Sequence, residues 1–223
     1  MKAKHTPARA RRLVMTGALA LAAGSLFLVG PAHAGPREDF FKAIQLDRTS
    51  LMREALAGGL DPNTSDERGN TGLLLAVREG SFEVAELLLA TKGIEVDRPN
   101  AADETPLMMA AVRGHHDWAV RLMERGAAVD RSGWTPLHYA ASGPQPQLLA
   151  LLLQRGARIE ALSANGTTAL MMAAGYGAID GAELLLARGA DAARRNARGL
   201  DAADFARRAG RDALARRLEA AVR

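Results

Sequence analysis

Two neighbouring histidines and a carboxylate, His115-His116-Asp117, are the residues whose types could bind a metal ion. Imidazole and carboxylate groups are common zinc ligands, but a site needs three or four at suitable spacing. The chain has no Cys, no His-Glu-x-x-His sequence and no Gly-rich loop ending in Gly-Lys-Ser or Gly-Lys-Thr. We therefore predict no enzyme activity, no catalytic or metal site and no cofactor. A metal-ligand role for His115 or His116 is the minor alternative.

The elements that carry these residues come from a sequence repeat. Its fullest copy is Thr135-Pro136-Leu137-His138-Tyr139-Ala140-Ala141. Thr can cap a helix by accepting from a free backbone N–H, and Pro suits the first helical position. Related copies start at Thr71, Thr105 and Thr168, and a degraded one starts at Asp201. The starting positions 71, 105, 135, 168 and 201 therefore differ by 34, 30, 33 and 33.

A period near 33 with this motif resembles the ankyrin repeat. The resemblance covers the chain from about residue 35 to residue 223. It implies an all-α solenoid of about six helix-turn-helix units with short hairpin-like fingers between them. The expected units are residues 35–64, 65–97, 98–130, 131–160, 161–193 and 194–223. The resemblance also implies structural roles for two histidines. His115 would form hydrogen bonds in the turn and between repeats, and His138 would bridge neighbouring Thr hydroxyls and backbone groups.

Within these units the apolar spacing and the glycines predict individual helices. The expected ranges are 39–46, 50–57, 72–79, 82–90 and 212–222. Trp118 falls at an apolar position of an outer helix, so we expect it in the core. The segment 127–134 is three residues shorter than its counterparts, because Thr135 lies nine positions after Gly126 where the other copies have an interval of twelve. This shortened finger predicts a local notch with Trp134 at its base, unless Trp134 folds back over Pro136.

The two methionine pairs, Met108-Met109 and Met171-Met172, could offer thioether sulfur to copper. The first pair starts at position 108 and the second at position 171, so two repeats separate them. Packed helices lie about 8–10 Å apart, which places the two pairs roughly 20 Å from each other. They cannot share one ion, and we interpret them as flexible core residues.

Residues 1–34 predict a signal peptide typical of bacterial export. Five basic residues and no acid precede the apolar stretch 13–30, and Ala32-His33-Ala34 provides a cleavage site. We expect cleavage after Ala34 and a periplasmic or secreted protein, with no membrane association after cleavage. An uncleaved anchor is the alternative, and Arg11-Arg12 leaves the twin-arginine and general export routes open.

The charge balance argues against a nucleic-acid partner once that segment is set apart. The whole chain has 29 basic and 25 acidic residues; without the five basic residues it has 24 and 25. A nucleic-acid-binding protein needs a basic face. Nine Arg and four acids fall within 194–223. We interpret them as keeping the open end of the stack soluble, with a phosphate or lipid site as the alternative.

The resemblance implies protein binding through a concave face, built from the fingers and the exposed side of the inner helices. We therefore predict a non-enzymatic interaction module, monomeric by itself, with another protein as partner. The alternative is an immunity or inhibitor protein that blocks an exported enzyme. Carried over by position, the face comprises Arg68, Asn70, Arg78, Glu79, Glu104, Val112, Arg113, Trp134, Ser142, Thr167 and Tyr176.

Overall fold

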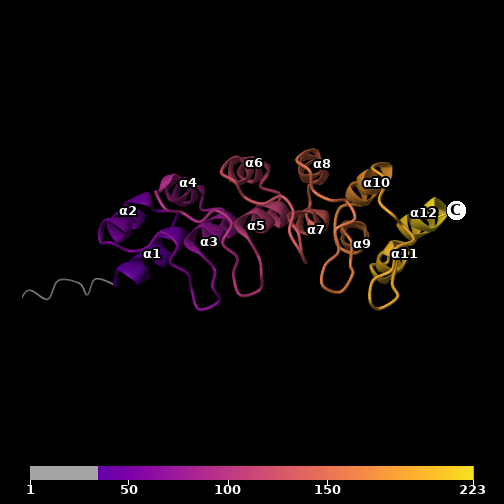
Figure 1. Cartoon of the computed structure of the whole chain (residues 1–223), viewed down its shortest axis with the longest axis horizontal. Coiled ribbons are helices and arrows are strands. Elements are labelled where there is room, and N and C mark those ends of the chain that lie inside the picture. Colours follow the sequence, from indigo (N-terminus) through magenta and orange to yellow (C-terminus); the bar gives the residue numbers. More distant parts are fainter. Residues whose placement is uncertain (1–34, 223) are drawn as a thin grey trace, which may run out of the picture. The chain divides into compact units, whose positions relative to one another are not determined.

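The computed structural model describes residues 35–222, which fold into twelve α-helices arranged as successive antiparallel pairs (Figure 1). Among these residues the only β-pairing is an isolated bridge between Ser65 and Thr71. The first member of each pair is α1 (Pro36–Gln45), α3 (Gly72–Glu79), α5 (Pro106–Arg113), α7 (Pro136–Ser142), α9 (Ala169–Gly175) and α11 (Ala202–Arg208). The second is α2 (Thr49–Ala57), α4 (Phe82–Ala90), α6 (His116–Glu124), α8 (Pro146–Gln154), α10 (Ile179–Ala187) and α12 (Asp212–Ala221).

The predicted caps begin most of the inner helices. The hydroxyls of Thr71, Thr105 and Thr168 each accept from the backbone N–H three residues on. Asp201 does the same with its carboxylate, at 3.0 Å from the nitrogen of Asp204. At Thr135 the hydroxyl lies instead 2.8 Å from the imidazole of His138. The repeated motif therefore fixes where each inner helix starts, as expected from cap chemistry.

The helices lie in two layers that share one continuous apolar core. Each of α3, α5, α7 and α9 packs against the next inner helix and against its own outer helix. Ala residues at the inner-helix contacts, such as Ala110 and Ala140, are buried and allow this close approach. Trp118 is 7% exposed and stacks on Phe82, so its expected place in the core is confirmed.

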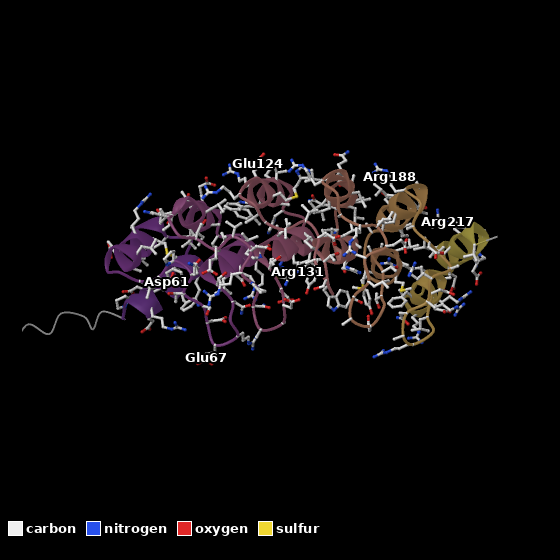
Figure 2. All side chains as sticks on the ribbon, viewed as in Figure 1. Asp61, Glu67, Glu124, Arg131, Arg188 and Arg217 are labelled. Carbon is white, nitrogen blue, oxygen red and sulfur yellow. The ribbon has the colours of Figure 1, made fainter. Side chains whose placement is uncertain are left out.

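Five fingers project from the inner-helix layer, on the side away from the outer helices (Figure 1). They comprise residues 60–70, 94–104, 127–134, 157–167 and 190–200. The finger between α6 and α7 is the shortest in the picture, as its sequence predicts. Figure 2 places Glu67 at a finger tip, while Glu124, Arg188 and Arg217 lie along the outer helices.

Shortening of finger 127–134 interrupts the backbone links between fingers. The nitrogen of Ala101 donates to the carbonyl oxygen of Arg68 at 3.0 Å, and that of Ala197 donates to Asn165 at 2.9 Å. Within residues 35–222, finger 127–134 makes no such backbone bond to a neighbouring finger. Side-chain ion pairs connect it instead, from Asp103 to Arg131 and from Asp130 to Arg158.

The helix boundaries agree with the sequence-based ranges at 72–79 and 82–90 and differ elsewhere. The first helix begins at Pro36 rather than near 39, because Gly35 serves as N-cap and Pro36 needs no hydrogen-bond partner there. The helix expected at 50–57 begins one residue earlier, at Thr49, and the one expected at 212–222 ends at Ala221. Tyr176, expected on an inner helix, is the C-cap residue after α9.

The predicted signal peptide, residues 1–34, lies outside the described residues. In the part of the chain that is described, no helix combines the length and apolar character needed to cross a membrane.

Candidate functional site

The finger face, defined here as the five fingers and the exposed sides of α3, α5, α7, α9 and α11, carries two separate hollows. Three of the predicted surface residues, Arg68, Arg78 and Glu79, line the first, which consists of two adjoining hollows that share Phe41, Asp66 and Arg78. Trp134, Ser142 and Tyr176 line the second, a groove of about 590 Å³ over the last three helix pairs. The residues chosen by position in the repeat thus separate into two groups rather than forming one site.

Asn70 and Thr167 line the two hollows but are far more buried than their predicted place on the face implies. The side chain of Asn70 is buried at 2% exposure. Its Nδ2 donates to Asp66 at 2.8 Å, and its Oδ1 accepts from the Nδ2 of Asn100 at 2.7 Å. Thr167 is equally buried, and its carbonyl oxygen accepts from His138 on α7. Each residue joins neighbouring elements and therefore contributes little exposed side chain to the hollow that it lines.

Glu104 is half-buried and already engaged on both carboxylate oxygens. Oε1 accepts from the hydroxyl of Tyr139 at 3.1 Å, and Oε2 accepts from Asn100 at 2.8 Å. Burial raises the pKa of the Tyr139 phenol well above its ordinary value, and the nearby Glu104 carboxylate adds to the rise. Glu104 therefore holds finger 94–104 against α7 through Tyr139.

Of the other predicted positions, Arg113 is exposed and Val112 half-buried, and neither lines the two hollows. Arg78 forms an ion pair with Glu79 at 3.0 Å on the rim of the first hollow. Ser142 donates from its hydroxyl to the carbonyl oxygen of His138 at 3.0 Å. The aromatic residues of the predicted face, Trp134 and Tyr176, both lie at the second groove.

The second groove has aromatic walls. Tyr176 is 65% exposed, the highest value among the large apolar side chains of the described region. Its ring meets that of Phe205 edge to face, with centroids 6.4 Å apart. Trp134 is half-buried and makes edge contacts with His138 and Tyr139, at centroid distances of 5.3 and 6.4 Å. Trp134 thus packs against its own repeat while presenting part of the indole to the groove.

Phe205, Met172 and Leu200 complete the apolar lining and were missed by the positional reasoning. Two of them, Met172 and Phe205, could have been identified from the sequence. The fifth residue of every motif copy is large and apolar: Leu75, Met109, Tyr139, Met172 and Phe205. This residue is half-buried in four of the five copies, so it forms an apolar stripe along the finger face.

The eighth residue of the motif helps to open the groove beside α9. Other copies have Arg78, Val112, Ser142 or Arg208 there, whereas the fifth unit has Gly175. A Cβ at Gly175 would lie 3.1 Å from Cδ1 of Phe205. The missing side chain therefore lets the Phe205 ring lie against α9 and leaves the space above it open.

The other chemical candidates occupy structural positions. His115 packs its ring edge against Phe82, at a centroid distance of 4.9 Å, and burial lowers its pKa. His116 and Asp117 are at the surface, 3.5 Å apart. Across residues 35–222 no group of three or more potential metal ligands comes together. Met108, Met109 and Met171 are buried in the core.

Stacked antiparallel helix pairs with projecting fingers define this chain as a helical repeat solenoid. More specifically, the chain belongs to the ankyrin-repeat family: a family model described as ankyrin repeats in three copies matches residues 40–132 and 122–196. The B-cell lymphoma 3 protein homolog of Mus musculus is 31% identical over 153 residues, which are 66% of this chain and 34% of that protein.

Two further relatives show the same limited coverage. Ankyrin repeat and SOCS box protein 11 of Homo sapiens is 36% identical over 112 residues, 49% of this chain and 34% of that protein. The nuclear factor NF-kappa-B p105 subunit of Mus musculus is 33% identical over 140 residues, 60% of this chain and 14% of that protein. The chain spans about a third or less of these curated relatives, so the likeness concerns the repeat region.

Proposed function

We propose that this chain is a non-enzymatic interaction module, exported from the cytoplasm to the periplasm, that binds a partner protein through its finger face. Ankyrin repeats generally serve protein binding, and the family assignment covers more than half of the chain. The observation that carries the proposal is the exposed aromatic groove around Tyr176 and Trp134. Tyr and Trp are the side chains most often found as energetic anchors of protein interfaces.

Capture of a partner tests the binding part of this proposal. The full chain, tagged at its C-terminus, is used to retain proteins from a periplasmic extract, and a variant carrying Tyr176→Ala and Phe205→Ala serves as the matched control. We expect one or more proteins to be retained by the wild type and lost with the variant. Retention of the same proteins by both would contradict binding through the groove, and retention of none by either would contradict the interaction role.

Localisation is tested separately by cell fractionation and N-terminal sequencing. The basic start, the apolar stretch and Ala32-His33-Ala34 lead us to expect a mature protein that begins at Gly35 outside the cytoplasm. An intact Met1 or a cytosolic protein contradicts export. If the captured partner is an exported enzyme, a stoichiometric complex without activity supports the inhibitor form of the proposal, and an active complex contradicts that form.

A further inference from the structure

The groove beside α9 combines an apolar floor with a positive rim. Met172, Tyr176, Leu200 and Phe205 contribute the apolar surface. Arg198, from the last finger, and Arg208, at the end of α11, are exposed and also line it. No carboxylate is among the lining residues. Its volume of about 590 Å³ falls within the range of roughly 300–1,000 Å³ that is usual for ligand pockets.

Arg198 and Arg208 differ from the arginines that form ion pairs in the last two units. Arg194, Arg195, Arg207 and Arg217 each form an ion pair with an acidic residue. Within the described part of the chain, neither Arg198 nor Arg208 has such a partner.

Within residues 35–222 no neighbouring acid pairs with the rim. Asp201 and Asp204 are held by Arg195 and Arg207. Asp212, four residues after Arg208, forms no ion pair in the described region and does not line the groove. The rim of the groove therefore carries two positive charges without compensation, and guanidinium groups bind carboxylates in paired hydrogen bonds.

We propose that this groove binds an acidic segment of the partner protein, in which one large apolar side chain packs against Tyr176 and Phe205. Carboxylates that flank this apolar residue meet Arg198 and Arg208. The inference rests on the proposed function and adds the chemistry of the bound segment. The same charges disfavour this chain's own segment 1–34 as the occupant, because it contains five basic residues and no acid.

Gly175 provides a way to close the groove with a small shift of the Phe205 ring. It is the last residue of α9, with no left-handed backbone conformation, and the three atoms nearest to an added Cβ all belong to Phe205, the closest at 3.1 Å. A leucine at position 175 fits the helical backbone and places its side chain over Phe205, where the apolar anchor of the partner would lie. Gly175→Leu therefore removes the apolar site, whereas Arg198→Glu with Arg208→Glu reverses the charge of the rim.

The experiment selects short random peptides displayed on phage against the full chain and measures the recovered peptides by fluorescence anisotropy. We expect enrichment of Asp and Glu around one Leu, Ile, Phe or Trp. Gly175→Leu and the double charge reversal should each weaken binding at least about tenfold. Arg216→Glu, an equally exposed arginine on α12 outside the groove, should leave it unchanged. Higher salt should weaken binding to the wild type.

Urea denaturation of each variant establishes that it is folded before its affinity is compared. Recovery of basic or neutral peptides, recovery of none, or equal affinity for wild type and both groove variants would overturn the proposal. A concentration-dependent dimer that Gly175→Leu abolishes would also overturn it, since the occupant would then be a second copy. If the periplasmic partner is still retained by both folded groove variants but lost with Arg68→Glu and Arg78→Glu, the interaction role stands and this inference fails.

Discussion

The imidazole of His138 joins α7 to finger 157–167, because its Nε2 lies 2.9 Å from the carbonyl oxygen of Thr167. Its other nitrogen, Nδ1, accepts from the backbone N–H of Thr135 at 3.2 Å and from the Thr135 hydroxyl at 2.8 Å. A carbonyl oxygen can only accept, so Nε2 carries the proton and the ring is neutral. The bridging role expected of His138 from the motif is present in the structure.

This arrangement predicts a loss of stability in mildly acidic solution. Burial lowers the pKa of His138 below its ordinary value of 6.5, although the Thr167 carbonyl and the Asp130 carboxylate act in the opposite direction. Between the ordinary pKa and the lowered one, His138 is protonated in the unfolded chain and neutral in the folded chain. The free energy of unfolding therefore falls as the pH decreases through this interval. Urea denaturation at pH 7.5 and pH 5 measures the difference.

His138→Gln is the matched variant for that measurement. We expect it to be less stable than the wild type at pH 7.5 but to lose less on acidification. His115, whose pKa burial also lowers, contributes to the pH dependence that remains. An equal loss in wild type and variant between the two pH values would show that His138 is not the responsible group.

The second prediction concerns the shared core of the outer helices. Leu152 on α8 and Leu185 on α10 are fully buried, so replacing either by Ala should lower the free energy of unfolding by about 2–5 kcal/mol. Arg216 on α12 is exposed, and its replacement by Ala should cost less than about 0.5 kcal/mol. Urea denaturation of the three variants compares them, and similar losses in all three would contradict the assignment of buried and exposed sides.

Much of the architecture was predictable because the repeat imposes the same local chemistry several times. Thr71 caps the start of α3, and Gly80 ends the helix in a left-handed conformation. The sequence alone therefore predicted the range 72–79 correctly. The short finger followed from counting residues between Gly126 and Thr135.

The site was less predictable because exposure within a finger depends on the neighbouring finger. Asn70 looks like a surface residue within its own unit, but Asn100 of the next finger buries it. The apolar fifth residue of the motif was readable from the sequence, yet Phe205 acquires its role only through contact with Tyr176 and the open space at Gly175. Such contacts join separate repeats, and the spacing within one repeat does not reveal them.

The third prediction concerns Gly177, where the turn after α9 lies against the end of α7. A Cβ added to Gly177 would be 1.8 Å from the carbonyl oxygen of Ala141, which is backbone and cannot rotate away. Gly177→Ala should therefore force the two repeats apart and destabilise the protein by about 1–3 kcal/mol or more. The thermal midpoint and urea denaturation report this loss.

Gly175→Ala, two residues earlier, is the control for that substitution. The three atoms nearest to its added Cβ all belong to the side chain of Phe205, which can move by the small amount required. Because Ala favours a helix over Gly by roughly 0.5–1 kcal/mol, we expect little change or a slight gain in stability. Equal destabilisation by both substitutions would mean that the close approach at Ala141 is not the cause.

The last prediction separates the two aromatic anchors of the groove. Tyr176 is largely exposed and touches Phe205, so Tyr176→Ala should weaken partner binding about tenfold or more while the midpoint of unfolding stays nearly constant. Trp134 also packs on His138 and Tyr139, so Trp134→Ala should reduce both binding and stability. Affinity for the captured partner is measured at a temperature at which both variants remain fully folded. If folded Trp134→Ala binds as tightly as the wild type, the indole is a packing residue that fills the notch of the short finger, and Tyr176 alone is the anchor. If Tyr176→Ala also binds normally, the partner does not use this groove.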